Sequence, residues 1–303
     1  MGGLSRGLKM LARALVMAAI LGGGPAMAQN VEVAPGVMLN VVEAGEDTGA
    51  PTLVLVPGWS MASEVWRAQI DHFSRDRRVI AIDPRSQGES TKTGYGNTPA
   101  VRARDLHAVL EAKGVRRPVL VGWSQGVQDI AAYVAQYGTD DLAGLVLVDS
   151  AIAGGARSMT PANAEANTVT FVRMAIYQQY QAEYVQGFLD AIITQPQPQE
   201  RLDRLAADAM KIPPAIGVAI MIADLFGDDH SAAADKIRRP TLVIASDSSP
   251  ELERQRELAA RIPGARFEIV ADAGHALFVD QPERFNALLT EFLAALPVEE
   301  AND

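Results

Sequence analysis

The residue whose setting points most directly to chemistry is Ser124. It stands in the pentapeptide Gly-Trp-Ser-Gln-Gly at 122–126, directly after the apolar run Val119–Val121 and directly before a helix-like stretch. Glycines at both ends permit a sharp strand-to-helix turn, which lifts the serine hydroxyl clear of the backbone. The helix that begins there also points free N–H groups and the positive end of its dipole toward a developing oxyanion. This pattern predicts a nucleophilic serine.

A serine hydroxyl is a weak nucleophile at neutral pH and needs a neighbouring base, usually histidine. His275 follows the apolar run Phe267–Val270 in a Gly-His loop. The carboxyl ends of parallel strands meet at one edge of a sheet, so this loop is expected at the same edge as Ser124. Serine first and histidine last is an order in which such catalytic sets occur. We therefore expect His275 to be the base.

The other three histidines have simpler explanations. His72 and His107 fall inside predicted helices and are expected to be surface or packing residues. His230 follows two aspartates, but three adjacent residues rarely converge on one ion, so we expect a solvated turn there. The sequence thus predicts no metal site, and the absence of cysteine excludes thiolate ligands and a thiol nucleophile.

Short apolar runs alternate with longer amphipathic stretches along most of the chain. Runs rich in Val, Ile and Leu, mostly without polar alternation, predict strands buried on both faces. Their alternation with helices predicts a mostly parallel α/β sheet flanked by helices on both sides. We expect strands at Met38–Val42, Leu53–Val56, Val79–Ile82, Val119–Val121, Leu145–Val148, Leu242–Ala245 and Phe267–Val270. We expect helices at Trp66–Ser74, Val101–Lys113, Gly126–Tyr137, Glu251–Ile262 and after Pro282.

The interval 152–239 breaks this alternation, because it contains only helix-like pieces. We expect helices at Val169–Leu189, Arg201–Met210 and Pro214–Phe226. Strands resume afterwards, so the sheet domain is predicted to be discontinuous, with a core at 29–151 and 240–303 and a helical cap at 152–239. An insertion that leaves the carboxyl end of a strand lies over the edge where open α/β sheets bind ligands. The cap is therefore a candidate lid.

Composition excludes several classes of protein. The chain has 303 residues, 48% of them hydrophobic and 21% charged, with a net charge of −10, which excludes a disordered chain and a basic nucleic-acid binder.

Residues 1–28 combine a basic start, an apolar run at 14–21 and Ala-Met-Ala, the order of a secretory signal peptide. The apolar run is much shorter than the roughly 20 residues of a membrane span. We expect a periplasmic or secreted protein without a stable membrane anchor; removal of the signal leaves 24 basic and 37 acidic residues.

Four motifs in order resemble those of the α/β-hydrolase family. Residues 53–59 resemble its oxyanion strand, residues 82–90 its D-x-R-x-x-G-x-S loop, and residues 122–126 and 274–275 its serine and histidine motifs. The resemblance spans nearly all of 31–297 and implies backbone amides of Trp59 and Gln125 as the oxyanion hole. It departs at Pro57, where the family usually has histidine. Asp83 and Arg85 are expected to organise their loop through an ion pair.

Two aspartates compete for the role of the triad acid. In similar hydrolases the acid usually follows the strand that corresponds to Leu242–Ala245, which favours Asp247. Some relatives supply it from the end of the preceding strand, which favours Asp149, directly after Leu145–Val148. Either carboxylate would hold His275 in the productive tautomer. We prefer Asp149 on loop length and keep Asp247 as the alternative.

Together these features predict an exported serine hydrolase that cleaves small or medium carboxylic esters, thioesters or lactones without a cofactor. A cofactor-free perhydrolase or haloperoxidase of the same fold is the first alternative, and a noncatalytic ligand-binding homologue is the second. The expected partner is a small ester-like molecule, and no nucleic acid is expected. Apolar residues of the cap and of the predicted site suggest a small or medium apolar acyl or alcohol group. They are Trp59, Met61, Trp123, Met159, Phe171, Met174, Tyr177, Tyr180, Met210, Met221 and Phe226.

Overall fold

The computed structural model describes residues 26–297. Residues 1–25 of the predicted signal peptide lie outside the described residues. Met27 and Ala28, the last residues predicted for the signal, instead open strand β1 (Met27–Ala34), which pairs with the next strand. No strand was expected there, because its first residues read as the end of the signal.

The core is one eight-stranded sheet in the order β1-β2-β4-β3-β5-β6-β7-β8. The β1–β2 and β2–β4 pairs are antiparallel, and all other pairs are parallel. The expected mostly parallel sheet is therefore confirmed. The remaining strands are β2 (Val37–Ala44), β3 (Leu53–Val56), β4 (Val79–Ile82), β5 (Val119–Trp123), β6 (Gly144–Val148), β7 (Thr241–Ser246) and β8 (Arg266–Val270).

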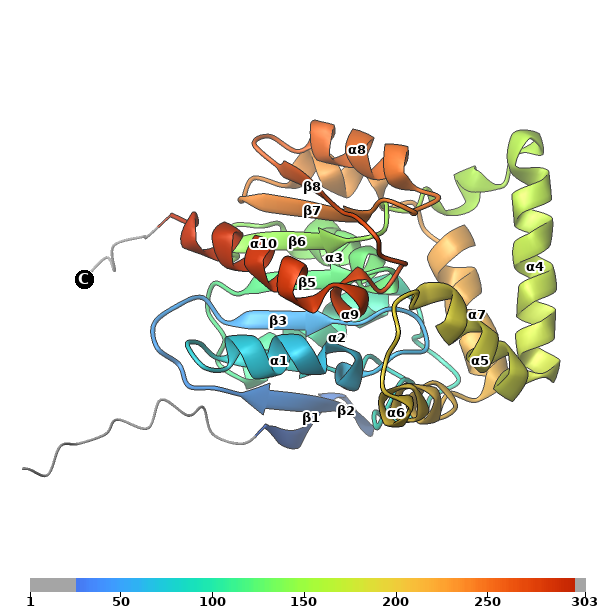
Figure 1. Ribbon diagram of the computed structural model, residues 1–303, viewed down its shortest axis with the longest axis horizontal. Coiled ribbons are helices and arrows are strands. Elements are labelled where there is room, and N and C mark those ends of the chain that lie inside the picture. Colours follow the sequence, from blue (N-terminus) through green and yellow to red (C-terminus); the bar gives the residue numbers. More distant parts are fainter. Residues whose placement is uncertain (1–25, 298–303) are drawn as a thin grey trace, which may run out of the picture.

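Helices cover both faces of the sheet, and the central strands are apolar throughout because both of their faces are buried. Leu53 and Leu55 of β3 belong to the same buried cluster as residues of α1 and α10, whereas Val54 and Val56 belong to a second cluster with residues of α2, α3 and α8. Figure 1 shows α1, α9 and α10 in front of the sheet and α2 and α3 behind it. These helices are α1 (Arg67–Phe73), α2 (Pro99–Ala112), α3 (Gln125–Tyr137), α8 (Leu252–Arg261), α9 (Leu277–Asp280) and α10 (Pro282–Ala294).

Four helices are inserted between β6 and β7, and they lie beyond the carboxyl ends of the parallel strands (Figure 1). They are α4 (Ala164–Gln179), α5 (Gln181–Ile192), α6 (Gln199–Ala209) and α7 (Pro214–Phe226). The single helix expected at Val169–Leu189 is broken at Tyr180, whose φ of −134° and ψ of 59° are not helical. Within the insertion predicted at 152–239, these four helices span residues 164–226, and from here on the word cap refers to them.

The helical segment that follows the cap belongs to the core. Ala233 and Ala234 in the 3₁₀ segment Ser231–Lys236 are buried in the same cluster as α3 and α8. Among residues 26–297 no single helix is long and apolar enough to cross a membrane; only α6 and α7 taken together reach that length and hydropathy, and they meet at an angle of 86°.

Candidate active site

Ser124 occupies a strained turn between β5 and α3. Its φ of 56° and ψ of −115° lie outside the regions that residues with a side chain normally adopt. A Cβ on Gly122 would lie 2.5 Å from the carbonyl oxygen of Gly126, and a Cβ on Gly126 would lie 2.4 Å from that of Val56. The glycines are therefore required because backbone segments approach closely on both sides of the serine.

Asp149 lies next to this turn, because β5 and β6 are paired neighbours. Trp123 and Val148 are partners in the register, so the residues that follow them leave the sheet side by side. The Ser124 amide donates to the Val148 carbonyl at 3.1 Å. Asp149 also has a positive φ, 46°, and its amide donates to the carbonyl of Ile244 at 2.8 Å.

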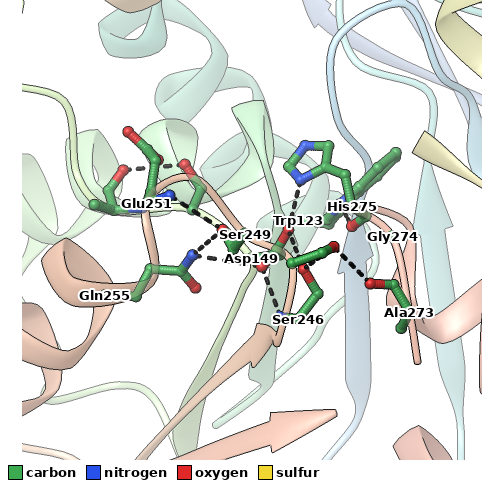
Figure 2. A network of polar contacts seen from close by, with 12 residues as sticks. Trp123, Asp149, Ser246, Ser249, Glu251, Gln255, Ala273, Gly274 and His275 are labelled. Carbon is green, nitrogen blue, oxygen red and sulfur yellow. Dashed lines mark hydrogen bonds and ion pairs between the residues drawn. The ribbon is translucent and has the colours of Figure 1, made fainter. Parts of the chain in front are cut away.

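The Asp149 carboxylate contacts His275. Oδ2 of Asp149 lies 2.8 Å from Nδ1 of the imidazole, and Figure 2 shows this contact in a wider polar network. Oδ1 accepts from the Ser246 amide at 2.8 Å and from Gln255 Nε2 at 3.4 Å. The carboxylate side chain is completely buried, whereas the imidazole is 31% exposed. A carboxylate acceptor at Nδ1 places the ring proton there and leaves Nε2 as the free, basic nitrogen.

The loop that carries His275 is anchored at three points. The carbonyl of His275 accepts from Nε1 of Trp123 at 2.8 Å, so the residue before the serine also fixes the histidine loop. The Gly274 amide donates to Asp280 Oδ2 at 2.7 Å, and the Ala276 amide donates to the carbonyl of Ile192 at 2.8 Å. Ile192 ends α5, so the histidine loop also contacts the cap.

Asp247 has a different role. Its Oδ2 accepts from the Asp272 amide at 3.1 Å and so bridges the loops that follow β7 and β8. The side chain is exposed, and no contact with His275 is found among the described residues. The two candidate aspartates, of which the sequence favoured Asp149 on loop length, are thus distinguished by their surroundings.

The loop after β3 passes directly over the serine. A Cβ on Gly58 would lie 3.0 Å from Cε3 of Trp123 and 3.1 Å from Cβ of Ser124, so this loop is packed tightly against the serine turn. Within the described residues, neither the Trp59 nor the Gln125 backbone amide donates a hydrogen bond to the protein. Both candidate oxyanion donors are therefore unpaired.

Two residues of the 82–90 loop differ from expectation. Arg85 does not pair with Asp83; its guanidinium forms two hydrogen bonds, of 2.6 and 2.8 Å, with Asp105 on α2. Asp83 instead accepts from the amides of Ser63 and Glu89, at 2.7 and 2.9 Å. The expected ion pair within the loop is therefore wrong, because α2 packs close enough to supply a buried carboxylate.

Sequence reasoning missed three polar side chains around the site. Gln87 is completely buried and bonds the loop over the serine, while Ser246 and Gln255 contact Asp149. A glutamine or serine carries no signal by type alone. Only the position of Gln87 inside the 82–90 motif could have drawn attention to it.

Aromatic residues join the cap to the candidate site. The Trp59 ring contacts Tyr177, Tyr184 and Phe188 edge to face, with centroids 4.9, 6.0 and 5.5 Å away. Its Nε1 donates to the carbonyl of Gly217 on α7 at 2.9 Å. Burial raises the pKa of Tyr177 to about 12, so this phenol stays neutral.

The apolar residues named from sequence in the inserted segment fall into three groups. Met174 and Tyr177 are buried, Met221 and Phe226 are half-buried, and Met159, Phe171, Tyr180 and Met210 are exposed. The expected Asp-Asp-His turn is held by contacts of Asp229 with Arg157 and the Ser231 amide. Among residues 26–297 no three His, Cys, Asp or Glu side chains are grouped so that they could hold a metal ion.

Comparisons with known proteins place these observations in a family. A family model described as "Alpha/beta hydrolase family" matches residues 53–288. A bifunctional esterase/perhydrolase from Acinetobacter calcoaceticus is 38% identical over 102 residues, which are 33% of this chain and only 37% of that protein. A 2-hydroxy-6-oxononadienedioate/2-hydroxy-6-oxononatrienedioate hydrolase from Paraburkholderia phymatum is 27% identical over 286 residues, 87% of this chain and 97% of that protein. The fold is also that of an esterase from Exiguobacterium antarcticum, with a TM-score of 0.79 and 20% identity over 89% of this chain and 100% of that one.

Proposed function

The chain belongs to the alpha/beta hydrolase family, and from that premise we propose that it is a serine hydrolase acting on small or medium carboxylic esters. The observation that carries the proposal is the 2.8 Å contact between His275 Nδ1 and Asp149 Oδ2, at the strand ends where the Ser124 turn also lies. The proposed triad is Ser124, His275 and Asp149.

In the proposed reaction Ser124 Oγ attacks the acyl carbon while Nε2 of His275 removes its proton. Buried Asp149 stabilises the imidazolium and keeps the ring in the required tautomer. The unpaired amides of Trp59 and Gln125 donate to the oxyanion of the tetrahedral intermediate. The intermediate collapses to an acyl-enzyme as the alcohol leaves with the proton from His275. Water, activated by the same nitrogen, then releases the acid and restores Ser124.

The proposed substrate class follows from the surroundings of the site. Trp59, Tyr184 and Phe188 form an aromatic cluster between the cap and the oxyanion loop, which favours an apolar acyl or alcohol group. The fold relatives include an esterase, and the proposal of ester cleavage for this chain rests on that likeness together with the triad geometry.

Substitution of Ser124 tests the proposal. We expect Ser124→Ala to lower turnover of short p-nitrophenyl esters by at least about 1,000-fold and to abolish labelling by a fluorophosphonate. Ser74→Ala, at the end of α1, is the matched control and should label like the wild type. Equal labelling of Ser124→Ala and wild type would refute the nucleophile, and a wild type that neither labels nor turns over would favour a noncatalytic binding protein.

Perhydrolysis is the second candidate, because the relative that is 38% identical over 102 residues is a bifunctional esterase/perhydrolase. In this reaction hydrogen peroxide replaces water, attacks the acyl-enzyme and leaves as the peracid. Peracid formation from acetate and hydrogen peroxide, measured beside ester hydrolysis, decides between the two activities. Both should disappear in Ser124→Ala.

Export through the N-terminal segment is a further part of the proposal. It rests on the basic, apolar and small-residue order of residues 1–28. N-terminal sequencing of the protein recovered from a periplasmic fraction should begin near Gln29. Recovery of the whole chain in the cytoplasm would refute export.

A further inference from the structure

We propose that Gln87 is a positioning residue that fixes the orientation of the oxyanion-hole amide of Trp59. The inference rests on the proposed function, because the amide has a catalytic role only if Ser124 is acylated. Among the described residues no hydrogen bond joins Gln87 to Ser124 or His275; its side chain bonds the backbone of residues 58–61 and acts through it.

The argument begins with one peptide group. Nε2 of Gln87 donates to the carbonyl oxygen of Gly58 at 3.2 Å. That carbonyl and the N–H of Trp59 belong to the same planar peptide, and the described chain has no cis peptide bond. In a trans peptide the two groups point in opposite directions. A side chain that holds the carbonyl oxygen therefore also sets the direction of the N–H.

Gln87 forms two further hydrogen bonds with the same loop, and we call the three bonds together the clamp. Nε2 of Gln87 also donates to the carbonyl of Met61 at 3.1 Å, and its Oε1 accepts from the amide of Ser60 at 2.8 Å. Because two partners are acceptors and the third is a donor, only one orientation of the side-chain amide satisfies all three. Ser60 has a φ of 59°, so the clamp secures a turn that its own backbone does not favour.

The peptide bond between Gly58 and Trp59, which Gln87 holds, lies beside the serine. Gly58 lies so close to the serine that a Cβ would be 3.1 Å from Ser124 Cβ. Pro57 precedes it and has no N–H with which to brace the loop. Gln87 is completely buried, so water does not compete for these three bonds. A hydrogen bond to the Gly58 oxygen also polarises the peptide and strengthens its N–H as a donor.

A fixed donor stabilises charge that appears only in the transition state, so its loss lowers kcat more than it changes KM. We expect Gln87→Met, which keeps the length of the side chain but removes all three bonds, to lower kcat about 10-fold to 100-fold with KM within about twofold. The rate of fluorophosphonate labelling should fall by a similar factor, because the phosphoryl oxygen occupies the same hole.

Gln69→Met is the matched control. Gln69 is equally buried and its Nε2 donates to the Phe278 carbonyl and to Asn286, away from the loop over the serine. We expect it to lose thermal stability like Gln87→Met but to change kcat less than about twofold. Equal losses of kcat in both variants, or an unchanged kcat in Gln87→Met, would overturn the positioning role.

Two further measurements complete the test. If Gln87→Met does not fold, Gln87→Glu replaces it and is judged by the same criteria. Gln87→Glu keeps the acceptor for the Ser60 amide but loses both donated bonds. Failure of both variants to fold would show a purely structural role and overturn the proposal. Amide exchange of residues 58–62, followed by mass spectrometry, should accelerate in the Gln87 variants and not in Gln69→Met. Because amide exchange needs no substrate, the two proposals can fail separately. An inactive wild type would refute the proposed ester hydrolysis, whereas unchanged amide exchange in the Gln87 variants would refute the positioning role of Gln87.

Discussion

At the scale of single residues, the candidate site depends on two residues with a backbone conformation that side chains rarely adopt. Ser124 and Asp149 both have positive φ angles, and both stand directly after paired residues of neighbouring strands. The strain is local, whereas the pairing that supports it is made by the whole sheet. The sheet thereby presents a hydroxyl and a carboxylate at fixed positions above one edge.

The choice of the acid leads to a prediction at this scale. Asp149→Asn should lower kcat for ester hydrolysis about 100-fold or more, because an amide at this position no longer favours the proton on His275 Nδ1 or stabilises the imidazolium. Asp247→Asn is the matched variant and should retain kcat within about twofold, since its side-chain oxygen can still accept from the Asp272 amide. The kcat values of both variants, measured on one ester, provide the test. The reverse order of effects would assign the acid to Asp247.

Sequence alone predicted the type and setting of the candidate residues, and it preferred Asp149 over Asp247 as the partner of the histidine only on loop length. Ser124 is marked by local glycines and His275 by its loop, and both signals lie within a few neighbouring residues. The choice between Asp149 and Asp247 depends instead on how three loops, far apart in the sequence, meet above the sheet. The role of Gln87 depends in the same way on the loop after β3.

At the scale of elements, the core strands were predictable because their apolar runs are short and bounded by turns. β3 and β4 have the expected bounds, and the inner strands differ by one or two residues. The break in the cap at Tyr180 was not predicted, because residues 169–189 are apolar at helical spacing on both sides of it. The two helices on either side of the break, α4 and α5, contact each other in the structure.

Two cap glycines in helices test how tightly the cap elements pack. A Cβ on Gly217 of α7 would lie 2.5 Å from the ring of Tyr177 on α4, whereas a Cβ on Gly187 of α5 would meet nothing within 4 Å. Alanine favours a helix over glycine by about 1 kcal/mol, but overpacking costs about 1–3 kcal/mol. We expect Gly217→Ala to lower the melting temperature and Gly187→Ala to raise it slightly. Equal shifts in differential scanning calorimetry would show that α4 and α7 are not in firm contact.

At the scale of the whole molecule, polar contacts fasten the cap to the core at separate places. Arg204 on α6 pairs with Glu64 at 3.0 Å, and Lys211 pairs with Glu89 at 2.7 Å; both pairs are largely exposed. Such exposed pairs contribute at most about 1 kcal/mol each. The buried contact between Arg102 of α2 and Asp224 of α7 is different, because neither side chain can exchange its partner for water.

The surroundings of Asp224 make this contact sensitive to pH. Arg102 also binds Asp129 on α3, at 2.8 Å, so one guanidinium faces two buried carboxylates, with Asp105 nearby on α2. Burial, and then the charge of Asp129, raise the pKa of Asp224 to about 7, against the opposing effect of Arg102. Between the ordinary pKa of 3.8 and about pH 7, the folded protein therefore keeps a proton that the unfolded chain has lost.

The sign of the resulting effect on stability follows from that proton. The contribution of Asp224 is fully present below pH 3.8 and is lost as the pH rises through about 7. Asp224→Asn imitates the protonated form at every pH, so we expect the margin by which its melting temperature exceeds that of the wild type to be larger at pH 8.5 than at pH 5, by about 2 °C or more. The titration of all other groups affects both proteins equally, so it drops out when the two melting temperatures are subtracted. Asp71→Asn, at an exposed position on α1, is the control and should show no such pH-dependent difference from the wild type. A constant difference between pH 5 and pH 8.5 would mean that Asp224 is already charged at pH 5 and that Arg102 stabilises both carboxylates together.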